Sequence, residues 1–328
     1  MKIVCTIITC VCWMFLCSCA TRCAPRGAVG SAVPAEASFN EDAGAGGLWG
    51  DLLFVTLRLE SGKELLFNVD TGAPVTVLDR SLEPILGKRQ GEKPIHYAWS
   101  DGTANTYRAP KLYLGNAQLR TGDLVWVDDL SGLHRPTNTL SSPVQGILGM
   151  DCMRHYAIQL DFDAGKMRFL ESGHLKREAL GMAFPLTIDH SGHVTVAGFF
   201  MGTKGVNAII DTGCACDGVL EPKEFQLALQ QQRAAWTNWF KYPTGFVRYT
   251  VCFQKLVFGG ESCTNIVIDE APAMVANGRT YYLNAIGLPF LARHLVTFDF
   301  PKRLMYLQPR AELSFNYSKP TNAPKTNP

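Results

Sequence analysis

The chain has 328 residues, of which 47% are hydrophobic and 18% are charged, and its formal net charge is +2 at pH 7. A nearly neutral chain that has no basic run with interleaved aromatic residues is not typical of a nucleic-acid-binding protein. The length and the hydrophobic content are sufficient for two hydrophobic cores.

The N-terminal segment predicts export. A basic start at Lys2 precedes residues 3–16, which are apolar and uncharged. This run has the length of a signal-peptide core and is too short for a membrane-spanning helix. The segment Leu16-Cys17-Ser18-Cys19 resembles a bacterial lipobox, in which Cys19 becomes the lipidated N-terminus. Two outcomes stay open: a lipoprotein of the bacterial cell envelope, or a cleaved protein that is secreted or periplasmic.

Two predicted hairpins each lead into the tripeptide Asp-Thr-Gly. The first has strands at residues 53–59 and 65–69 and ends in Asp70-Thr71-Gly72. The second covers residues 193–210 and ends in Asp211-Thr212-Gly213. The glycine allows a turn that a side chain would block, so each copy presents a carboxylate at the rim of a core.

A second shared motif follows each tripeptide. Gly146-Ile147-Leu148-Gly149 lies downstream of the first copy and Ala285-Ile286-Gly287 downstream of the second, and the two final glycines are 287−149 = 138 residues apart. The chain is therefore an internal repeat of two halves, each of small-domain length. Two such halves facing each other about a pseudo-two-fold axis bring their two Asp residues together.

This duplicated pattern resembles the aspartic proteases, in a bilobal pepsin-like architecture built from two retropepsin-like halves. The resemblance covers about residues 48–310 and implies an all-β, bilobal acid-protease fold, with two pseudo-symmetric β-barrel-like lobes and few short helices. It also implies that Asp70 and Asp211 are the catalytic pair, and that the chain passes behind each Asp loop at Gly149 and Gly287.

We expect four neighbouring residues to support the two active-site loops. Thr71 and Thr212 are predicted to bond across the interface between the halves, and Gly72 and Gly213 to complete the turns. These residues hold the loops rigid and take no part as acids or bases.

The position after each tripeptide departs from the family. Many pepsin-like members have Ser or Thr there, where the hydroxyl supports the carboxylate, but this chain has Ala73 and Cys214. Ala73 matches the retroviral style and Cys214 matches neither style. Without a hydroxyl beside the first carboxylate, we expect an activity optimum less acidic than that of pepsin-like enzymes, and a profile peaking below about pH 3 would contradict this.

The predicted organisation has five parts. We expect a signal peptide at residues 1–19, a flexible linker at 20–47, an N-terminal protease lobe at 48–178, a C-terminal protease lobe at 179–310 and a disordered tail at 311–328. The linker and the tail are rich in small and polar residues, which cannot bury enough apolar surface to fold by themselves.

A third hairpin is the candidate flap, the element that closes over the cleft in this family. Asp101-Gly102 lies between two alternating arms, which is a strong turn signal, so we place these two residues at the tip. Tyr97 and Trp99 share one face of the first arm and are predicted to contact substrate. An ordinary surface hairpin is the alternative. A weaker counterpart around residues 242–246 leaves open whether there is one flap or two.

One long helical pattern is predicted over residues 222–240. It begins with Pro222, which suits a first helical turn, and places Phe225, Leu229, Trp236 and Phe240 on one face. Its two tryptophans are interpreted as packing residues.

Of the 11 cysteines, six lie at or before Cys23, and five follow at 152, 214, 216, 252 and 263. An odd number cannot all pair within one chain. A disulfide among the last four is expected in an oxidising compartment. A zinc site is disfavoured, because their spacing lacks a Cys-x-x-Cys knuckle.

The predicted chemistry follows from two adjacent carboxylates. Like charges a few ångström apart cannot both ionise readily, so the pair shares a proton. The ionised member takes a proton from a water that attacks the scissile carbonyl, and the protonated member donates to the carbonyl oxygen. This chemistry calls for no cofactor and no metal.

The sequence therefore predicts an exported aspartic endopeptidase that acts on a peptide or protein substrate. It is expected to be a monomer, an internal pseudo-dimer with no nucleic-acid partner, and to be tethered to a membrane if Cys19 is lipidated. The alternative is a catalytically silent peptide-binding or scaffold lipoprotein that retains the protease fold. The intact Asp at both positions argues against this alternative.

Overall fold

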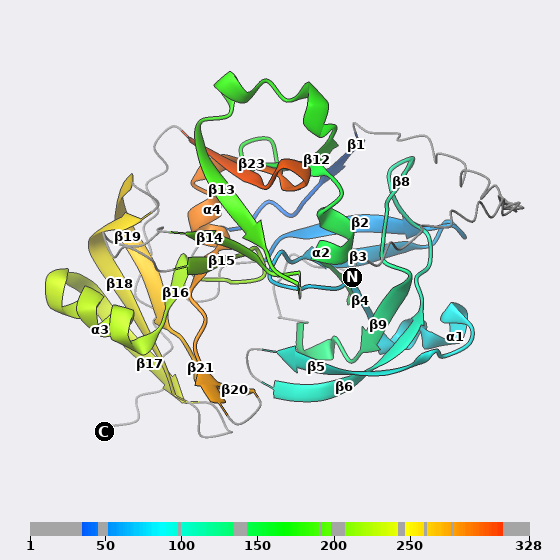
Figure 1. Cartoon of the computed structure of the whole chain (residues 1–328), viewed down its shortest axis with the longest axis horizontal. Helices are drawn as coiled ribbons and strands as arrows, with labels where there is room; N and C mark the ends of the chain where they lie inside the picture. The colour runs from blue at the N-terminus through cyan, green and yellow to red at the C-terminus, as the bar shows by residue number, and fades with distance from the viewer. Residues whose placement is uncertain are drawn as a thin grey trace, which may run out of the picture. The chain divides into compact units, whose positions relative to one another are not determined.

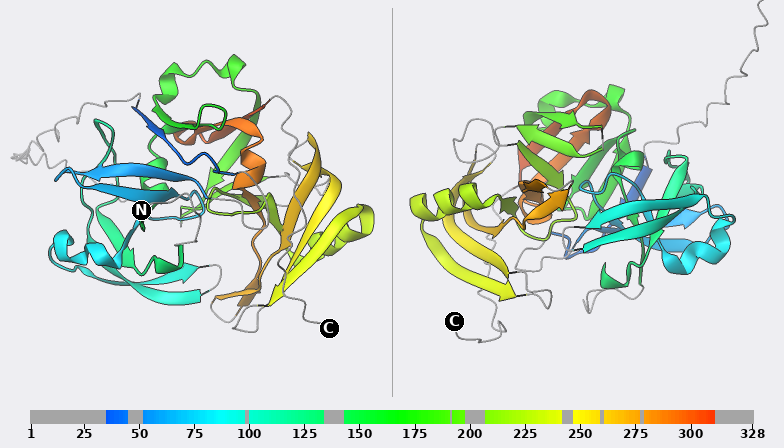
Figure 2. Two further views of the ribbon diagram at one scale, coloured as in Figure 1. Left: turned by 180° about the vertical axis from the view of Figure 1, so that it is seen from behind. Right: turned by 60° about the horizontal axis from the view of Figure 1, so that its bottom comes forward.

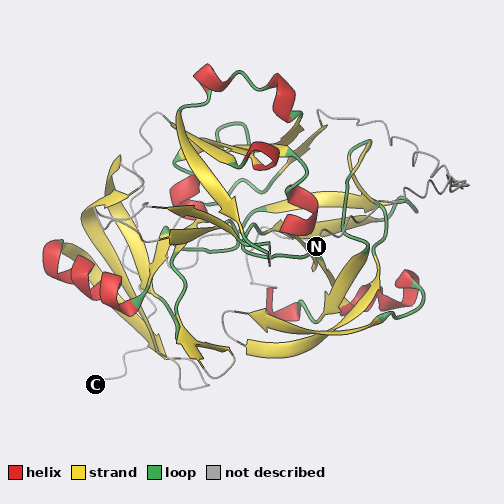
Figure 3. Cartoon of the chain, in the orientation of Figure 1, coloured by secondary structure: helices red, strands yellow, loops and turns green. Residues whose placement is uncertain are grey.

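Strands form most of the chain that the structure describes, and the helices between them are short (Figure 3). The computed structural model describes residues 35–44, 52–97, 100–133, 143–190, 192–197, 207–241, 247–258, 261–276 and 279–310. These ranges all lie in one compact unit, residues 32–328. No helix within them is long and apolar enough to cross a membrane.

The first half forms a nine-stranded sheet in the order β5-β6-β9-β4-β10-β3-β2-β7-β8 (Figure 1). Its strands are β2 Phe54–Leu59, β3 Glu64–Val69, β4 Val77–Asp79, β5 Gly91–Tyr97, β6 Ser100–Arg108, β7 Leu112–Leu114, β8 Ala117–Gln118, β9 Leu124–Asp128 and β10 Val144–Leu148. Strands β2 and β3 pair antiparallel, which confirms the hairpin predicted before the first tripeptide.

A thirteen-stranded sheet runs in the order β1-β12-β11-β23-β24-β13-β14-β15-β22-β16-β19-β18-β17. Its strands are β1 Ala35–Ser38, β11 Ala157–Asp161, β12 Lys166–Leu170, β13 Met182–Ile188, β14 Val194–Ala197, β15 Asn207–Asp211, β16 Gly218–Leu220, β17 Ala234–Lys241, β18 Val247–Phe258, β19 Glu261–Glu270, β22 Ala285–Gly287, β23 His294–Asp299 and β24 Leu304–Pro309. Strands β20 Met274–Ala276 and β21 Arg279–Tyr281 form a separate pair.

The described helical segments are the α-helices α1 Glu83–Leu86, α2 Met150–Met153, α3 Pro222–Gln231 and α4 Leu288–Leu291, and the 3-10 turns η1 Arg80–Leu82, η2 Ser131–Leu133, η3 Ser172–His174, η4 Arg177–Ala179 and η5 Phe300–Lys302. Helix α3 lies beside strands β18 and β19 (Figure 2) and buries Phe225 and Ala228 in the main core. The few short helices agree with the predicted all-β class.

The two halves repeat the same strand arrangement. In the first, β10 lies between β3, to which it is parallel, and β4, to which it is antiparallel. In the second, β22 lies between β15 and β16 with the same two orientations. Strands β4 and β16 each pair in parallel with a further strand, β9 and β19. The duplicated, bilobal acid-protease architecture predicted from the sequence is confirmed.

The large sheet joins the two halves. Strand β11 of the first half pairs antiparallel with β23 of the second, and Gln159 lies opposite Thr297, its equivalent at an offset of 297−159 = 138. A repeat whose equivalent residues face each other has its pseudo-two-fold axis between them. The Gln159 side chain also donates a hydrogen bond to Thr297 Oγ1 at 3.1 Å.

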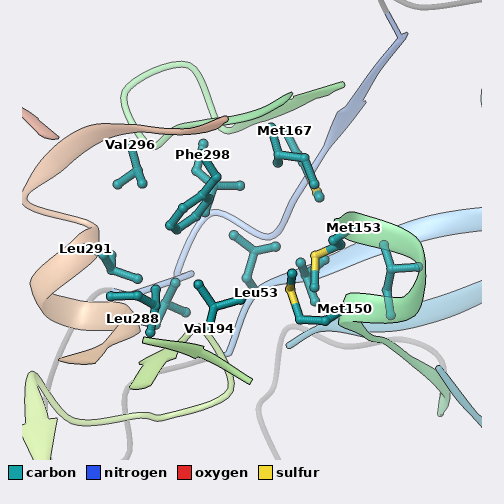
Figure 4. Packing of buried hydrophobic residues seen from close by; sticks show 14 of the residues in the cluster. Leu53, Met150, Met153, Met167, Val194, Leu288, Leu291, Val296 and Phe298 are labelled. Carbon is teal, nitrogen blue, oxygen red and sulfur yellow. The ribbon is translucent and has the colours of Figure 1, made fainter. Parts of the chain in front are cut away.

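One main core runs through both halves. Figure 4 shows side chains of the first half, among them Leu53 and Met150, packed near side chains of the second, among them Leu288 and Phe298. All four are 0–1% exposed. Burying an aliphatic or aromatic side chain of this size contributes about 1.5–3 kcal/mol, so the shared core holds the halves together.

The predicted linker is wrong for residues 35–44. Strand β1 pairs with β12, and Phe39 and Ala43 are buried in the main core. The ring of Phe39 packs on Phe162 with centroids 5.3 Å apart. Backbone pairing to a distant strand orders this segment despite its small-residue composition. Residues 1–34, with the predicted signal peptide and Cys19, and the predicted tail 311–328 lie outside the described residues.

The long helix predicted over residues 222–240 is also wrong in its second part. Helix α3 ends at Gln231, and β17 begins at Ala234 and pairs along its length with β18. Cross-strand pairing overrides the helical periodicity, which is a weak local preference. Trp236 is half-buried and packs beside other side chains, whereas Trp239 is 41% exposed, so the packing prediction holds only for Trp236.

Candidate active site

Matching strands deliver the two Asp-Thr-Gly tripeptides to one place. Asp70 follows strand β3, and Asp211 is the last residue of β15. Both strands are parallel to their neighbours β10 and β22, so each tripeptide begins at the carboxyl end of a buried strand. This is a position at which backbone groups leave the sheet and are free to bind one another.

The two threonines bond across the halves in a reciprocal pattern. Thr71 Oγ1 donates to the carbonyl of Ile210 at 2.7 Å and accepts the N–H of Thr212 at 3.0 Å. Thr212 Oγ1 donates to the carbonyl of Val69 at 2.7 Å and accepts the N–H of Thr71 at 3.0 Å. Both threonines are 0–2% exposed. Four buried hydrogen bonds therefore fix one loop against the other, as the sequence predicts.

Each glycine packs against the carboxyl group of the opposite half. A Cβ atom on Gly72 would lie 2.7 Å from Cγ of Asp211, and a Cβ atom on Gly213 would lie 2.6 Å from Cγ of Asp70. Neither space admits a side chain. The absence of Cβ at both positions is what lets the two carboxyl groups approach.

Backbone N–H groups bind both carboxylates, but unequally. Asp70 Oδ1 accepts from Gly72 at 2.8 Å and from Ala73 at 3.1 Å. Asp211 Oδ1 accepts from Gly213 at 2.9 Å. N–H donors favour the ionised form of a carboxyl group. The first carboxylate therefore receives more support for its negative charge from this loop backbone than the second.

Burial raises the pKa of both carboxyl groups. The pKa of Asp211 lies well above its ordinary value. Burial is the largest cause, and the neighbouring charges of Asp70 and Cys214 raise this pKa further. Burial also raises the pKa of Asp70, but hydrogen bonds from the N–H groups of Gly72 and Ala73 partly oppose this effect. Because the two carboxyl groups interact strongly, they titrate as a pair and not as two independent groups.

The chain passes close behind each loop at the two predicted glycines. A Cβ atom on Gly149 would lie 2.4 Å from the carbonyl of Val75, and one on Gly287 would lie 1.8 Å from the carbonyl oxygen of Cys216. The following residues donate to the same loops: Met150 N–H to Ala73 at 2.8 Å and Leu288 N–H to the carbonyl of Cys214 at 2.9 Å. The backbones thus repeat one geometry in both halves.

Sequence reasoning missed the buried polar group that supports the first loop. Asp151 Oδ1 accepts the N–H of Thr76 at 2.8 Å and its Oγ1–H at 2.7 Å. Thr76 Oγ1 in turn accepts the N–H of Gly149 at 3.3 Å. Asp151 follows the motif glycine by two residues, but nothing in its sequence context separates it from a surface carboxylate.

The second loop uses an ion pair instead, which the sequence analysis also missed. Asp217, which stands where the first half has Thr76 (217−211 = 76−70 = 6), is fully buried, and its Oδ1 lies 3.3 Å from Arg293 Nη2. Its Oδ2 accepts the N–H of Val267 at 2.8 Å. A fixed spacing of six residues after each catalytic-type Asp is the one sequence signal that could have pointed to it.

The expected disulfide is not present among the described residues. No disulfide joins any two of the five cysteines there, and the Sγ atoms of Cys214 and Cys216 lie 3.3 Å apart. A disulfide bond is about 2.05 Å long. No group of three or more His, Cys, Asp or Glu in the described ranges is arranged to hold a metal ion.

The candidate flap forms a hairpin, but its tip is not where we predicted it. Strands β5 and β6 pair antiparallel with Tyr97 opposite Ser100, so they are joined at residues 98–99, outside the described residues. Asp101 and Gly102 lie in strand β6 instead. The ladder continues to the pair Gly91–Thr106, and this long register overrides the local turn preference of Asp-Gly.

This hairpin packs on the first active-site loop. Ile95 of β5 and Ala104 of β6 are buried in a small cluster, against which Ala73 and Val75 of the loop pack. The flap role of Tyr97 and of Trp99, which is itself outside the described residues, stays a prediction.

A second hairpin, β17–β18, occurs in the other half, with Lys241 opposite Val247 and residues 242–246 outside the described ranges. Its Trp236 stands as far after Asp211 as Ile95 stands after Asp70 (25 residues each).

Two β lobes whose matching loops bring two carboxyl groups together define the class: a bilobal acid-protease fold with both aspartates in place.

Comparison with known families agrees with this class. Residues 55–152, which include Asp70, match the family model described as aspartyl protease. No curated protein matches the chain. The matched segment is less than half of the chain and lies in its first half, so over residues 55–152 the chain is similar to the aspartyl protease family.

The solved structures that match the chain include two basic 7S globulins. Basic 7S globulin from soybean has a TM-score of 0.50 at 12% identity, over 84% of this chain and 96% of that chain. Conglutin gamma, a basic 7S globulin from lupine seeds, has a TM-score of 0.49 at 12% identity, over 84% and 95%. At this identity, the likeness to the soybean protein shows the fold alone.

Proposed function

We propose that the chain is an aspartic endopeptidase, which hydrolyses peptide bonds with a water molecule activated between Asp70 and Asp211. The observation that carries the proposal is that each loop glycine packs directly against the carboxyl group of the opposite half. A Cβ atom at Gly72 or Gly213 would lie only 2.7 or 2.6 Å from that carboxyl carbon. Two carboxyl groups held this close favour a shared proton, which is the state that general acid–base hydrolysis needs.

In the proposed mechanism, the two carboxyl groups have different tasks. Asp211, whose pKa is raised the more by burial and by the neighbouring charge, carries the shared proton and donates it to the carbonyl oxygen of the substrate. Asp70, with two N–H groups on Oδ1, is ionised and accepts a proton from the attacking water. The backbone loops hold both groups in place, so little reorganisation accompanies the reaction.

The test is cleavage of a peptide library by the purified full chain. Wild type is expected to cleave, and Asp70→Asn and Asp211→Asn are each expected to lose at least about 10²-fold in kcat/KM, the lower range for a general acid or base. Asp163→Asn is the matched control, because that carboxylate is 69% exposed and pairs with Arg310 on the surface.

Equal residual cleavage by wild type and both active-site variants would reject the enzyme and favour the alternative, a silent peptide-binding or scaffold protein. Loss of activity in the surface control as well would point to misfolding, which circular dichroism spectra of all four proteins detect. A single chain supplies both carboxyl groups, so we propose a monomeric enzyme, which the mass from light scattering checks.

We also propose export, on the sequence alone, with lipidation at Cys19 as one outcome and simple cleavage as the other. Expression in bacteria with labelled palmitate separates them: label lost in Cys19→Ala supports the anchor. Label absent from wild type supports cleavage without lipid. A product that keeps residues 1–19 in the cell interior contradicts export.

A further inference from the structure

The two active-site loops carry different side chains at the same backbone positions. Three residues follow each tripeptide, Ala73-Pro74-Val75 in the first half and Cys214-Ala215-Cys216 in the second. Ala215 is buried at the junction of the halves, in a cluster with Leu52 and Phe54. The thiols on either side of it approach each other, with their sulfur atoms 3.3 Å apart.

We propose that Cys214 and Cys216 form a reversible disulfide site, which switches the loop of Asp211 between an open dithiol and a closed, slower form. The co-reactant is a low-molecular-weight disulfide. The thiolate of Cys214 attacks one of its sulfur atoms and releases one thiol. The thiolate of Cys216 then attacks the mixed disulfide and releases the second thiol. Two protons and two electrons leave the protein, and the small disulfide is reduced to two thiols.

Access favours this pair over the other cysteines of the described residues, because Cys214 is partly exposed. Of the five, Cys214 alone is half-buried, and the other four are buried. Burial and the Asp217 carboxylate raise the pKa of Cys252 to about 11, and burial raises the pKa of Cys152 well above its ordinary value. Since the thiolate is the attacking species, those two thiols are poor nucleophiles.

Formation of the disulfide between Cys214 and Cys216 strains the loop that holds the carboxyl group of Asp211. The two sulfur atoms must move from 3.3 Å to about 2.05 Å apart. The carbonyl of Cys214 is bound by Leu288 N–H at 2.9 Å, and its N–H is bound by the carbonyl of Asp211 at 3.1 Å. The carbonyl of Cys216 lies against Gly287, where there is no space to yield. The strain therefore falls on the residues between Asp211 and Cys216.

The experiment incubates the folded full chain with oxidised glutathione and then blocks the remaining thiols with iodoacetamide. Mass spectrometry is expected to find the peptide that contains both residues lighter by two hydrogen atoms and unalkylated, with recovery of both thiols in dithiothreitol. Cys216→Ser is expected to stop at a mixed disulfide and gain one glutathione. Both thiols remaining alkylatable, or a bond from either one to Cys252, would overturn the proposal.

The effect on rate rests on the proposed function and is measured separately. Displacing a catalytic group by about 1 Å costs up to about 10²-fold, so the oxidised protein is expected to cleave peptides at least about 10-fold more slowly, reversibly. The double variant Cys214→Ala, Cys216→Val has the side chains that flank Pro74 in the first half. Its rate of peptide cleavage is expected to be unchanged by oxidised glutathione. Cys263→Ala, at a buried site in β19, is expected to keep the response.

The two readouts separate the two ideas. If wild type cleaves no peptide, the endopeptidase proposal fails. The mass spectrometry still tests whether Cys214 and Cys216 form a disulfide. If an active protein forms the disulfide with no change in rate, the switch fails and the endopeptidase stands.

Discussion

The two active-site loops have one backbone geometry and two different supports. The first loop packs Ala73 and Val75 on an apolar cluster and bonds Thr76 to Asp151. The second packs its two thiols in a separate cluster with Cys252 and Val267, and has a buried ion pair in place of the threonine network. What the halves share is the part that positions the carboxyl groups: the glycines, the threonines and the crossing strands. The lesson is that position is fixed by backbone, while the side chains behind it are exchangeable.

The sharpest test of this symmetry replaces the loop glycines. Gly72→Ala and Gly213→Ala each place a Cβ atom within 2.7 Å of the opposite carboxyl group, so each is expected to lower kcat/KM by about 10²-fold or more. Gly173→Ala is the control, because no atom lies within 4 Å of its added Cβ. Full activity in either active-site variant would contradict the shared backbone geometry, because that loop would then have room for a Cβ atom beside the opposite carboxyl group.

The two supports are expected to differ in energy. Arg293→Met leaves the carboxylate of Asp217, which is 0% exposed, without its ion-pair partner, and we expect a loss of about 3–5 kcal/mol in the free energy of unfolding. Asp151→Asn keeps an amide oxygen for Thr76, so we expect a loss of about 1 kcal/mol. Urea denaturation of both variants measures the difference. Equal losses would mean that the ion pair does no more than the neutral network.

The pH dependence of stability tests the raised pKa of Asp211. Because the pKa of Asp211 is raised in the folded protein, wild type loses stability as pH rises from the unfolded pKa, about 3.9, through the folded one. Asp211→Asn lacks this loss, so its free energy of unfolding should gain on wild type with rising pH over that interval, by about 1.4 kcal/mol for each unit of pKa shift.

Asp161 supplies the opposite sign as a control. Burial alone would raise its pKa, but the hydrogen bond and charge of Arg168, with the loop N–H groups, lower it overall. Its contribution to stability is present above the unfolded pKa and is lost as pH falls through the folded one. Asp161→Asn should therefore be least stable relative to wild type near neutral pH. The same direction of change in both variants would contradict the assignment of a raised pKa to Asp211.

Some predictions failed where a local signal competed with a distant strand. Asp101-Gly102 has the composition of a turn, yet it lies inside β6, because the register of a long ladder decides where the chain reverses. Trp236 fits a helical stripe, yet it lies in β17, which pairs along its length with β18. The expected linker contains β1, whose partner is more than 100 residues away. In each case a non-local hydrogen-bonded partner outweighed a preference of a fraction of a kcal/mol per residue.

The sequence by itself determined the repeat, the all-β class and the candidate Asp pair, because these depend on motifs and spacings that recur along the chain. Only the tertiary structure decided which groups stand behind the two loops. Asp151, Asp217 and Arg293 are brought into place by chain segments that meet only after folding. Burial and partners, which set the chemistry of a carboxyl or thiol group, are properties of that meeting and not of the residue order.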